Sequence, residues 1–123
     1  DSMKLIKFGM PISYVSLFII IILGESAGAI YFTIYILTSI VLTLAQPAVA
    51  LSFPTSLAGK SLTSFNLLIF VGTFIMQWGI GLIIDLSQFF GSEEILSFQI
   101  SFSLYLIICL FCYFYFILNN KNE

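Results

Sequence analysis

The sequence contains no histidine and no arginine, and its four lysines and six acidic residues make up only 8% of the 123 positions. A typical soluble domain has about 25% charged residues, so an ordinary soluble globule is excluded. The few lysines form no basic patch that could bind nucleic acid. Cys109 and Cys112 lie in one apolar run with no further ligand nearby, and a metal site needs more than two ligands. We therefore expect no nucleic-acid partner, no metal and no cofactor.

The residue patterns of catalysis are also missing. No nucleophile has a base beside it, no glycine-rich loop is suited to a phosphate, and no two carboxylates share an apolar run. The chain is therefore predicted not to be an enzyme. Glu25 and Asp85 lie at the ends of apolar runs, where we interpret them as solvated loop charges. The alternative, a proton-coupling carboxylate at the mouth of a transport path, requires burial in a cavity.

Long apolar runs dominate what is present, with 60% hydrophobic residues and a mean hydropathy of +1.13. As a helix, the charge-free run over residues 62–84 is roughly 35 Å long, enough to cross a hydrocarbon core of about 30 Å. Because a bilayer offers the backbone no hydrogen-bond partners, such runs must be helical. The sequence therefore predicts an all-α polytopic membrane protein, one bundle over residues 1–123 embedded in the lipid bilayer, with four transmembrane helices at about residues 8–23, 29–53, 62–84 and 95–118.

Three polar turns are expected between these helices, at residues 24–28, 53–61 and 85–95. Pro11 is placed near the start of the first helix, where its missing N–H is least costly. Pro47 lies inside the second run and predicts a kink. The first and fourth helices carry few polar residues in their apolar parts, and we expect them to face lipid. The aromatic band at residues 111–116 is interpreted as an interfacial anchor.

Polar residues in the third run share one face of the predicted helix. Asn66, Thr73 and Gln77 fall within about 40° of one another around a helix of 3.6 residues per turn. Gly72 and Gly79 lie on roughly the opposite face, where a missing side chain lets another helix approach closely. We interpret the first face as accessible to water or solute and the glycines as helix-packing positions.

The second run carries a comparable stripe of polar side chains, within about 80° of one face: Tyr35, Ser39, Thr43 and Gln46. Hydrogen bonding between helices and lining of a cavity explain this stripe equally well. The candidates for a substrate cavity are, from the two runs, Tyr35, Gln46, Asn66 and Gln77.

The lysines indicate how the chain is oriented. With four spans, all of them fall on one side of the membrane: Lys4, Lys7, Lys60 and Lys121. The positive-inside rule makes that side cytoplasmic. We therefore expect a multi-pass protein of the cell (inner) membrane with both ends in the cytoplasm.

Two segments, FPTSLAGK at residues 53–60 and NLLIFVGTFIMQWGIGLIID at residues 66–85, resemble bacterial members of the major facilitator superfamily. They are similar to the link between the tenth and eleventh helices of those transporters and to the eleventh helix, and they cover about a third of the chain. Lys60 stands where such sequences often have arginine, which keeps the charge but loses bidentate geometry.

This resemblance implies a twelve-helix fold of two six-helix halves that works by alternating access. The four spans then correspond to helices nine to twelve, and the partners are the remaining helices of the same transporter and a small solute. Helix ten would border the central cavity, helix eleven would flank it, and Lys60 would act in orientation and at a cytoplasmic gate. We expect the C-terminal part of a secondary active transporter. The alternative is a complete four-span protein, either a dimeric exporter or a structural membrane subunit.

Overall fold

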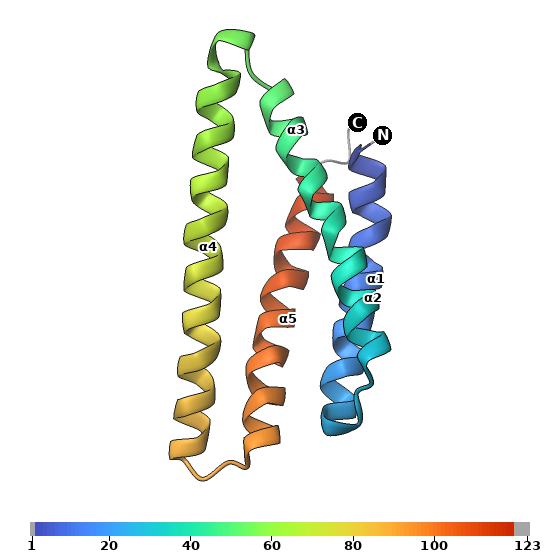
Figure 1. Ribbon diagram of the computed structural model, residues 1–123, viewed down its shortest axis with the longest axis vertical. Coiled ribbons are helices and arrows are strands. Elements are labelled where there is room, and N and C mark those ends of the chain that lie inside the picture. Colours follow the sequence, from blue (N-terminus) through green and yellow to red (C-terminus); the bar gives the residue numbers. More distant parts are fainter. Residues whose placement is uncertain (1, 120–123) are drawn as a thin grey trace.

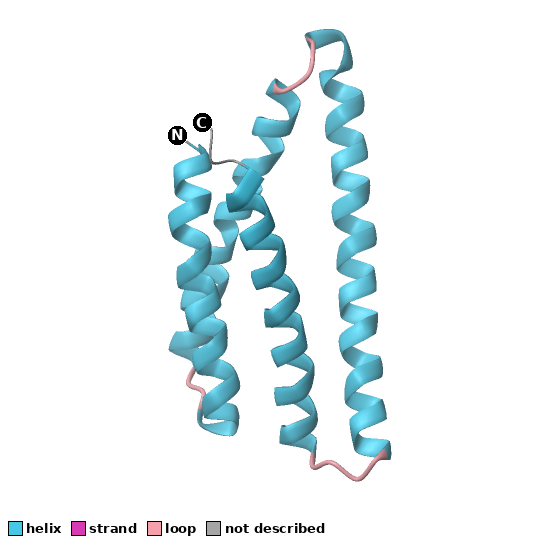
Figure 2. Ribbon diagram, turned by 180° about the vertical axis from the view of Figure 1, so that it is seen from behind, coloured by secondary structure: helices cyan, strands magenta, loops and turns pink. Residues whose placement is uncertain are grey.

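The computed structural model describes residues 2–119, which form helices joined by short turns (Figure 1, Figure 2). The α-helices are α1 (Ser2–Leu23), α2 (Ala29–Ser39), α3 (Ala45–Leu51), α4 (Thr55–Phe89) and α5 (Glu94–Asn119). Two short 3-10 helices, η1 (Gly24–Ser26) and η2 (Ile40–Leu44), lie between them. Four stretches are long and apolar enough to cross a membrane: Met3–Ser26, Ala29–Leu51, Thr55–Phe89 and Glu94–Asn119. The predicted all-α, multi-pass membrane fold with four spanning helices is confirmed.

Successive spans run antiparallel, so the start of α1 and the end of α5 lie at the same end of the bundle (Figure 1). The turn between α3 and α4 is also at that end. Lys4 and Lys7, in the first turns of α1, therefore lie at the same end as Lys60, near the start of α4. Lys121 lies outside the described residues. The opposite end holds η1 and the turn between α4 and α5.

α1 and α5 form the centre of the structure, because every buried residue of the described chain belongs to one of them. On α1 the buried stripe follows the helical repeat: Ile6, Met10, Ser13, Ser16 and Leu17. On α5 it consists of Ser97, Ser101 and Leu106. Small side chains let the two backbones approach closely, as is usual between membrane helices. Our expectation that both helices face lipid describes only their outer faces, where α1 exposes Leu5, Phe8, Ile12, Val15 and Ile22.

Pro11 lies in the interior of α1, so its predicted place near the helix start is wrong. The helix begins at Ser2, so the lead before the apolar run is also helical. Without an amide hydrogen, Pro11 cannot donate to the carbonyl of Lys7, four residues earlier. The Tyr113 hydroxyl on α5 donates to that carbonyl oxygen at 2.6 Å instead. A side chain from a neighbouring helix thus replaces the missing bond.

The kink expected from Pro47 is present as a change of helix type. The second span is α-helical to Ser39, narrows to the 3-10 segment η2 and becomes α-helical again in α3, which contains Pro47. Pro47 offers no N–H to the preceding turn, and its ring crowds the carbonyl four residues earlier. The distortion therefore lies immediately N-terminal to the proline.

The second turn is much shorter than the predicted one at residues 53–61. Only residues 52–54 separate α3 from α4, and the Pro54 carbonyl accepts from the Leu57 and Ala58 amides at 2.8 and 3.0 Å. Gly59 and Lys60 are consequently inside α4, and the assignment of Lys60 to a loop is wrong. A single glycine costs a helix only about 1 kcal/mol, too little to end it.

The third turn also begins later than predicted. α4 continues past Asp85 to Phe89, and the chain reverses at Gly91, whose φ of 89° is in the left-handed region that glycine tolerates. α5 then begins at Glu94, so this carboxylate lies in a first helical turn as expected. The first turn agrees with the prediction over residues 24–28, where Gly24 ends α1 with a φ of 52°.

Candidate solute groove

A groove lies between α4 on one side and α1 and α2 on the other. In the described structure α4 packs against α3 and α5 but makes no backbone contact with α1 or α2. The space between has a volume of about 770 Å³ and is lined by residues of all five α-helices and η2. Ligand pockets generally measure about 300–1,000 Å³, so this space, the central groove, is large enough for a small solute.

The polar side chains of the central groove come from four helices and carry no charge. Its lining includes, besides apolar residues, Tyr14, Tyr35, Thr73, Gln77, Tyr105 and Tyr113. These groups offer phenol and alcohol hydroxyls and one carboxamide as hydrogen-bond donors and acceptors. Cys109 and Cys112 line it as well. The groove can therefore bind a solute by hydrogen bonds and ring contacts.

The tyrosines form two pairs that join α1, α2 and α5. The hydroxyls of Tyr35 and Tyr105 lie 3.4 Å apart, a long contact that leaves both available to a solute. The rings of Tyr14 and Tyr113 meet edge to face with centroids 5.5 Å apart. This geometry is favourable for aromatic pairs. The Tyr113 hydroxyl is engaged with the Lys7 carbonyl, which fixes the ring pair in place.

The structure brings together two of the four predicted cavity residues. Tyr35 and Gln77 line the central groove from α2 and α4, whereas Gln46 and Asn66, both half-buried, are not part of its lining. Thr73 lies beside Gln77 in the groove, as the shared polar face of the third span predicted. The cavity role of all four candidates stays a prediction.

The two predicted packing glycines differ in position. Gly72 lines the central groove and Gly79 does not. A Cβ added at either glycine would meet no described atom within 4 Å. No helix of the described chain therefore uses either position for close approach, and their packing role stays a prediction.

Lys60 lies in a separate hollow between α3 and α4, about 420 Å³ in volume. Its neighbours there include Val49, Phe53 and Ser64. The side chain is exposed at the end of the bundle where α1 begins. This position suits a lysine at a membrane surface, where positive charge on the cytoplasmic side orients the chain.

The tyrosines of the groove on α1 and α5 were not among the residues predicted from the sequence. Tyr105, Cys109 and Tyr113 repeat every four residues, which places them on one helical face, so the spacing was available as a signal. The interpretation of residues 111–116 as an interfacial anchor left these positions out of the candidate site. The anchor interpretation fits Phe111, at 75% exposure, but Tyr113 points into the bundle.

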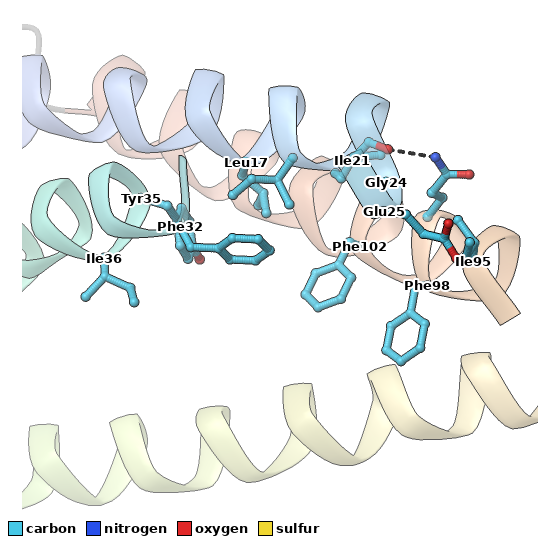
Figure 3. Close-up of a pocket in the computed structure, with 12 residues that line it drawn as sticks. Leu17, Ile21, Gly24, Glu25, Phe32, Tyr35, Ile36, Ile95, Phe98 and Phe102 are labelled. Carbon is cyan, nitrogen blue, oxygen red and sulfur yellow. Dashed lines mark hydrogen bonds between the residues drawn. The ribbon is translucent and has the colours of Figure 1, made fainter. Parts of the chain in front are cut away.

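A second cavity, the aromatic pocket, adjoins the central groove and shares Tyr35 and Phe102 with it. It measures about 430 Å³ and lies near η1, with Glu25 at its edge (Figure 3). Gln99 at this edge donates from Nε2 to the Ile21 carbonyl at 2.8 Å, which satisfies one of the carbonyls left open at the end of α1.

Comparison with protein-family models, with curated proteins and with solved structures finds no match to this chain. The resemblance of residues 53–85 to the major facilitator superfamily therefore stays a prediction from those residues.

Within residues 2–119, no group of three or more histidine, cysteine, aspartate or glutamate side chains is placed to hold a metal ion.

Proposed function

We propose that this chain is the C-terminal four-helix part of a secondary transporter of the major facilitator superfamily, which moves a small solute by alternating access. The observation that carries the proposal is the central groove, where uncharged polar groups from α1, α2, α4 and α5 meet within the spanning segments. Polar groups are costly in lipid and gather where membrane helices face a solute or water.

The residues of the groove take distinct parts in this proposal. Tyr35 from α2 and Gln77 from α4 both line the groove and bind the solute by hydrogen bonds. Gln46 and Asn66, outside the groove, contact the facing half of the transporter when access changes. The change of helix type at η2 gives the second span a place to bend.

The orientation follows from the lysines. Lys4, Lys7 and Lys60 lie at one end of the bundle, and we place this end in the cytoplasm of a bacterial cell, at its inner membrane. Lys60 lies close to the turn between α3 and α4, where it acts as part of a cytoplasmic gate. The remaining helices of the transporter would cover the open side of α4.

The test is solute uptake by the native polypeptide that contains this chain, reconstituted in proteoliposomes. A panel of labelled sugars, amino acids, organic acids and organic cations is supplied with and without a proton or sodium gradient. We expect uptake of at least one class and a fall of about fivefold for Gln77→Leu, since one hydrogen bond is worth about 1 kcal/mol.

Gln88→Leu is the matched control, because Gln88 is exposed near the end of α4 and outside the groove. We expect it to leave uptake unchanged. Equal uptake by Gln77→Leu and Gln88→Leu would remove Gln77 from the path. An inert protein whose mass equals that of the 123-residue chain would contradict the proposal and favour a complete structural subunit.

A further inference from the structure

The aromatic pocket combines rings with a single carboxylate. The rings of Phe98 and Phe102 point from α5 toward α4 (Figure 3), and they are nearly parallel, with centroids 6.4 Å apart. Phe32 and Tyr35 add two more rings from α2. Glu25 is the one charged side chain among the described residues that line either the aromatic pocket or the central groove.

Glu25 differs from an ordinary loop carboxylate because it borders a cavity. η1 places it at the end of α1, where the apolar wall of the pocket begins. Its side chain is exposed, so it keeps contact with water while it lines the same pocket as the rings. A pocket that has a carboxylate at its edge and aromatic rings along its wall can attract an organic cation, through Coulomb attraction and cation–π contacts.

The charge distribution of the bundle favours the same ligand. Asp85, near the end of α4, and Glu93 and Glu94, at the start of α5, lie at the same end of the bundle as Glu25 (Figure 1). Lys4, Lys7 and Lys60 are at the opposite end. Acidic groups at the mouth of a cleft raise the local concentration of cations and disfavour anions.

We propose that the aromatic pocket binds a hydrophobic organic cation, with Glu25 against the positive charge and the rings of Phe32, Phe98 and Phe102 around its apolar part. The inference rests on the proposed function for one point, that the bound cation is the solute in transit. Because Tyr35 and Phe102 belong to both cavities, a cation held in the aromatic pocket is next to the central groove.

The experiment uses radiolabelled tetraphenylphosphonium as a cation and tetraphenylborate as an anion of nearly the same shape. Equilibrium dialysis measures the binding of each to the native polypeptide in lipid nanodiscs, with empty nanodiscs subtracted to remove partition into lipid. We expect saturable binding of the cation, no saturable binding of the anion when it is measured alone, and a dissociation constant about tenfold higher for Glu25→Gln.

Glu93→Gln is the matched control, since Glu93 is an exposed glutamate at the same end of the bundle but outside the pocket. It should bind the cation as the unmodified protein does. Phe98→Leu keeps the pocket apolar but removes one ring, and should weaken binding about threefold. Phe98→Leu decides the matter where Glu25→Gln does not give a monodisperse protein.

Equal binding of the cation by Glu25→Gln and Glu93→Gln would overturn the inference, and so would binding of both ions with equal affinity. Failure of this inference is distinguishable from failure of the proposed function. Cation binding that depends on Glu25 in a protein that moves no solute would support the pocket and end the transport proposal. Uptake of neutral solutes without such binding would support the transport proposal and overturn the cation pocket.

Discussion

The hydrogen bond from Tyr113 to the Lys7 carbonyl is expected to stabilise the bundle because Pro11 leaves that carbonyl without its helical donor. Tyr113→Phe removes the hydroxyl and keeps the ring that packs on Tyr14. Hydrogen bonds between membrane helices are worth about 0.6 kcal/mol on average and up to about 1.7 kcal/mol. Since this bond is short at 2.6 Å and Pro11 has no amide hydrogen to donate to the same carbonyl, we expect a cost of about 1.5 kcal/mol.

A double-mutant cycle tests the cause of this stabilisation. Pro11→Ala restores an amide hydrogen that can reach the Lys7 carbonyl. In this background Tyr113→Phe should therefore cost less than about 0.5 kcal/mol of unfolding free energy. The free energy of unfolding is measured by SDS titration in mixed micelles for the four variants. Tyr115→Phe is the control, because Tyr115 is 66% exposed on the same helix and should change nothing. An equal cost of Tyr113→Phe with proline and with alanine at position 11 would refute the reasoning.

Three further predictions concern single side chains. Gln99→Leu should lower the unfolding free energy by about 1 kcal/mol in the same titration, because the Ile21 carbonyl at the end of α1 loses its donor. Tyr35→Phe should cost less than about 0.5 kcal/mol of stability, since its hydroxyl contact is long, but should weaken solute uptake in proteoliposomes. Pro47→Ala should stabilise the second span by up to about 3 kcal/mol and slow uptake, because η2 becomes regular helix. Unchanged stability and unchanged uptake would contradict the role of η2 as the place where the span bends.

The hydropathy of the sequence was enough to predict the four spans and their order, because a bilayer leaves the backbone no alternative to helix. It was not enough to predict helix ends. Lys60 and Asp85 were taken to mark turns because they are charged, yet both lie within α4. Charge reports the depth of a residue in the membrane, whereas a helix ends where the backbone changes conformation, as at Pro54 and Gly91.

The packing between helices was beyond sequence reasoning for a different reason. Ser13 and Ser101 are fully buried, yet each donates its hydroxyl to a carbonyl of its own helix. Their sequence positions therefore do not indicate that they are buried in the bundle. Tyr113 replaces a bond lost through Pro11, which lies about a hundred positions earlier in the chain. Such pairings depend on how α1 and α5 are placed, and only the folded chain supplies that information.

The central claim is that the central groove conducts a solute, which requires water in it at the depth of Cys112. The direct measurement is the reaction of Cys112, exposed on the groove and made the sole cysteine of the native polypeptide, with a charged methanethiosulfonate added to intact membranes. Thiosulfonates react with the thiolate, which forms where water is present. Rapid labelling that slows when the transported solute is added is the predicted result. A thiol that reacts only after the membrane is dissolved in detergent would mean that lipid fills the groove, and would contradict the account.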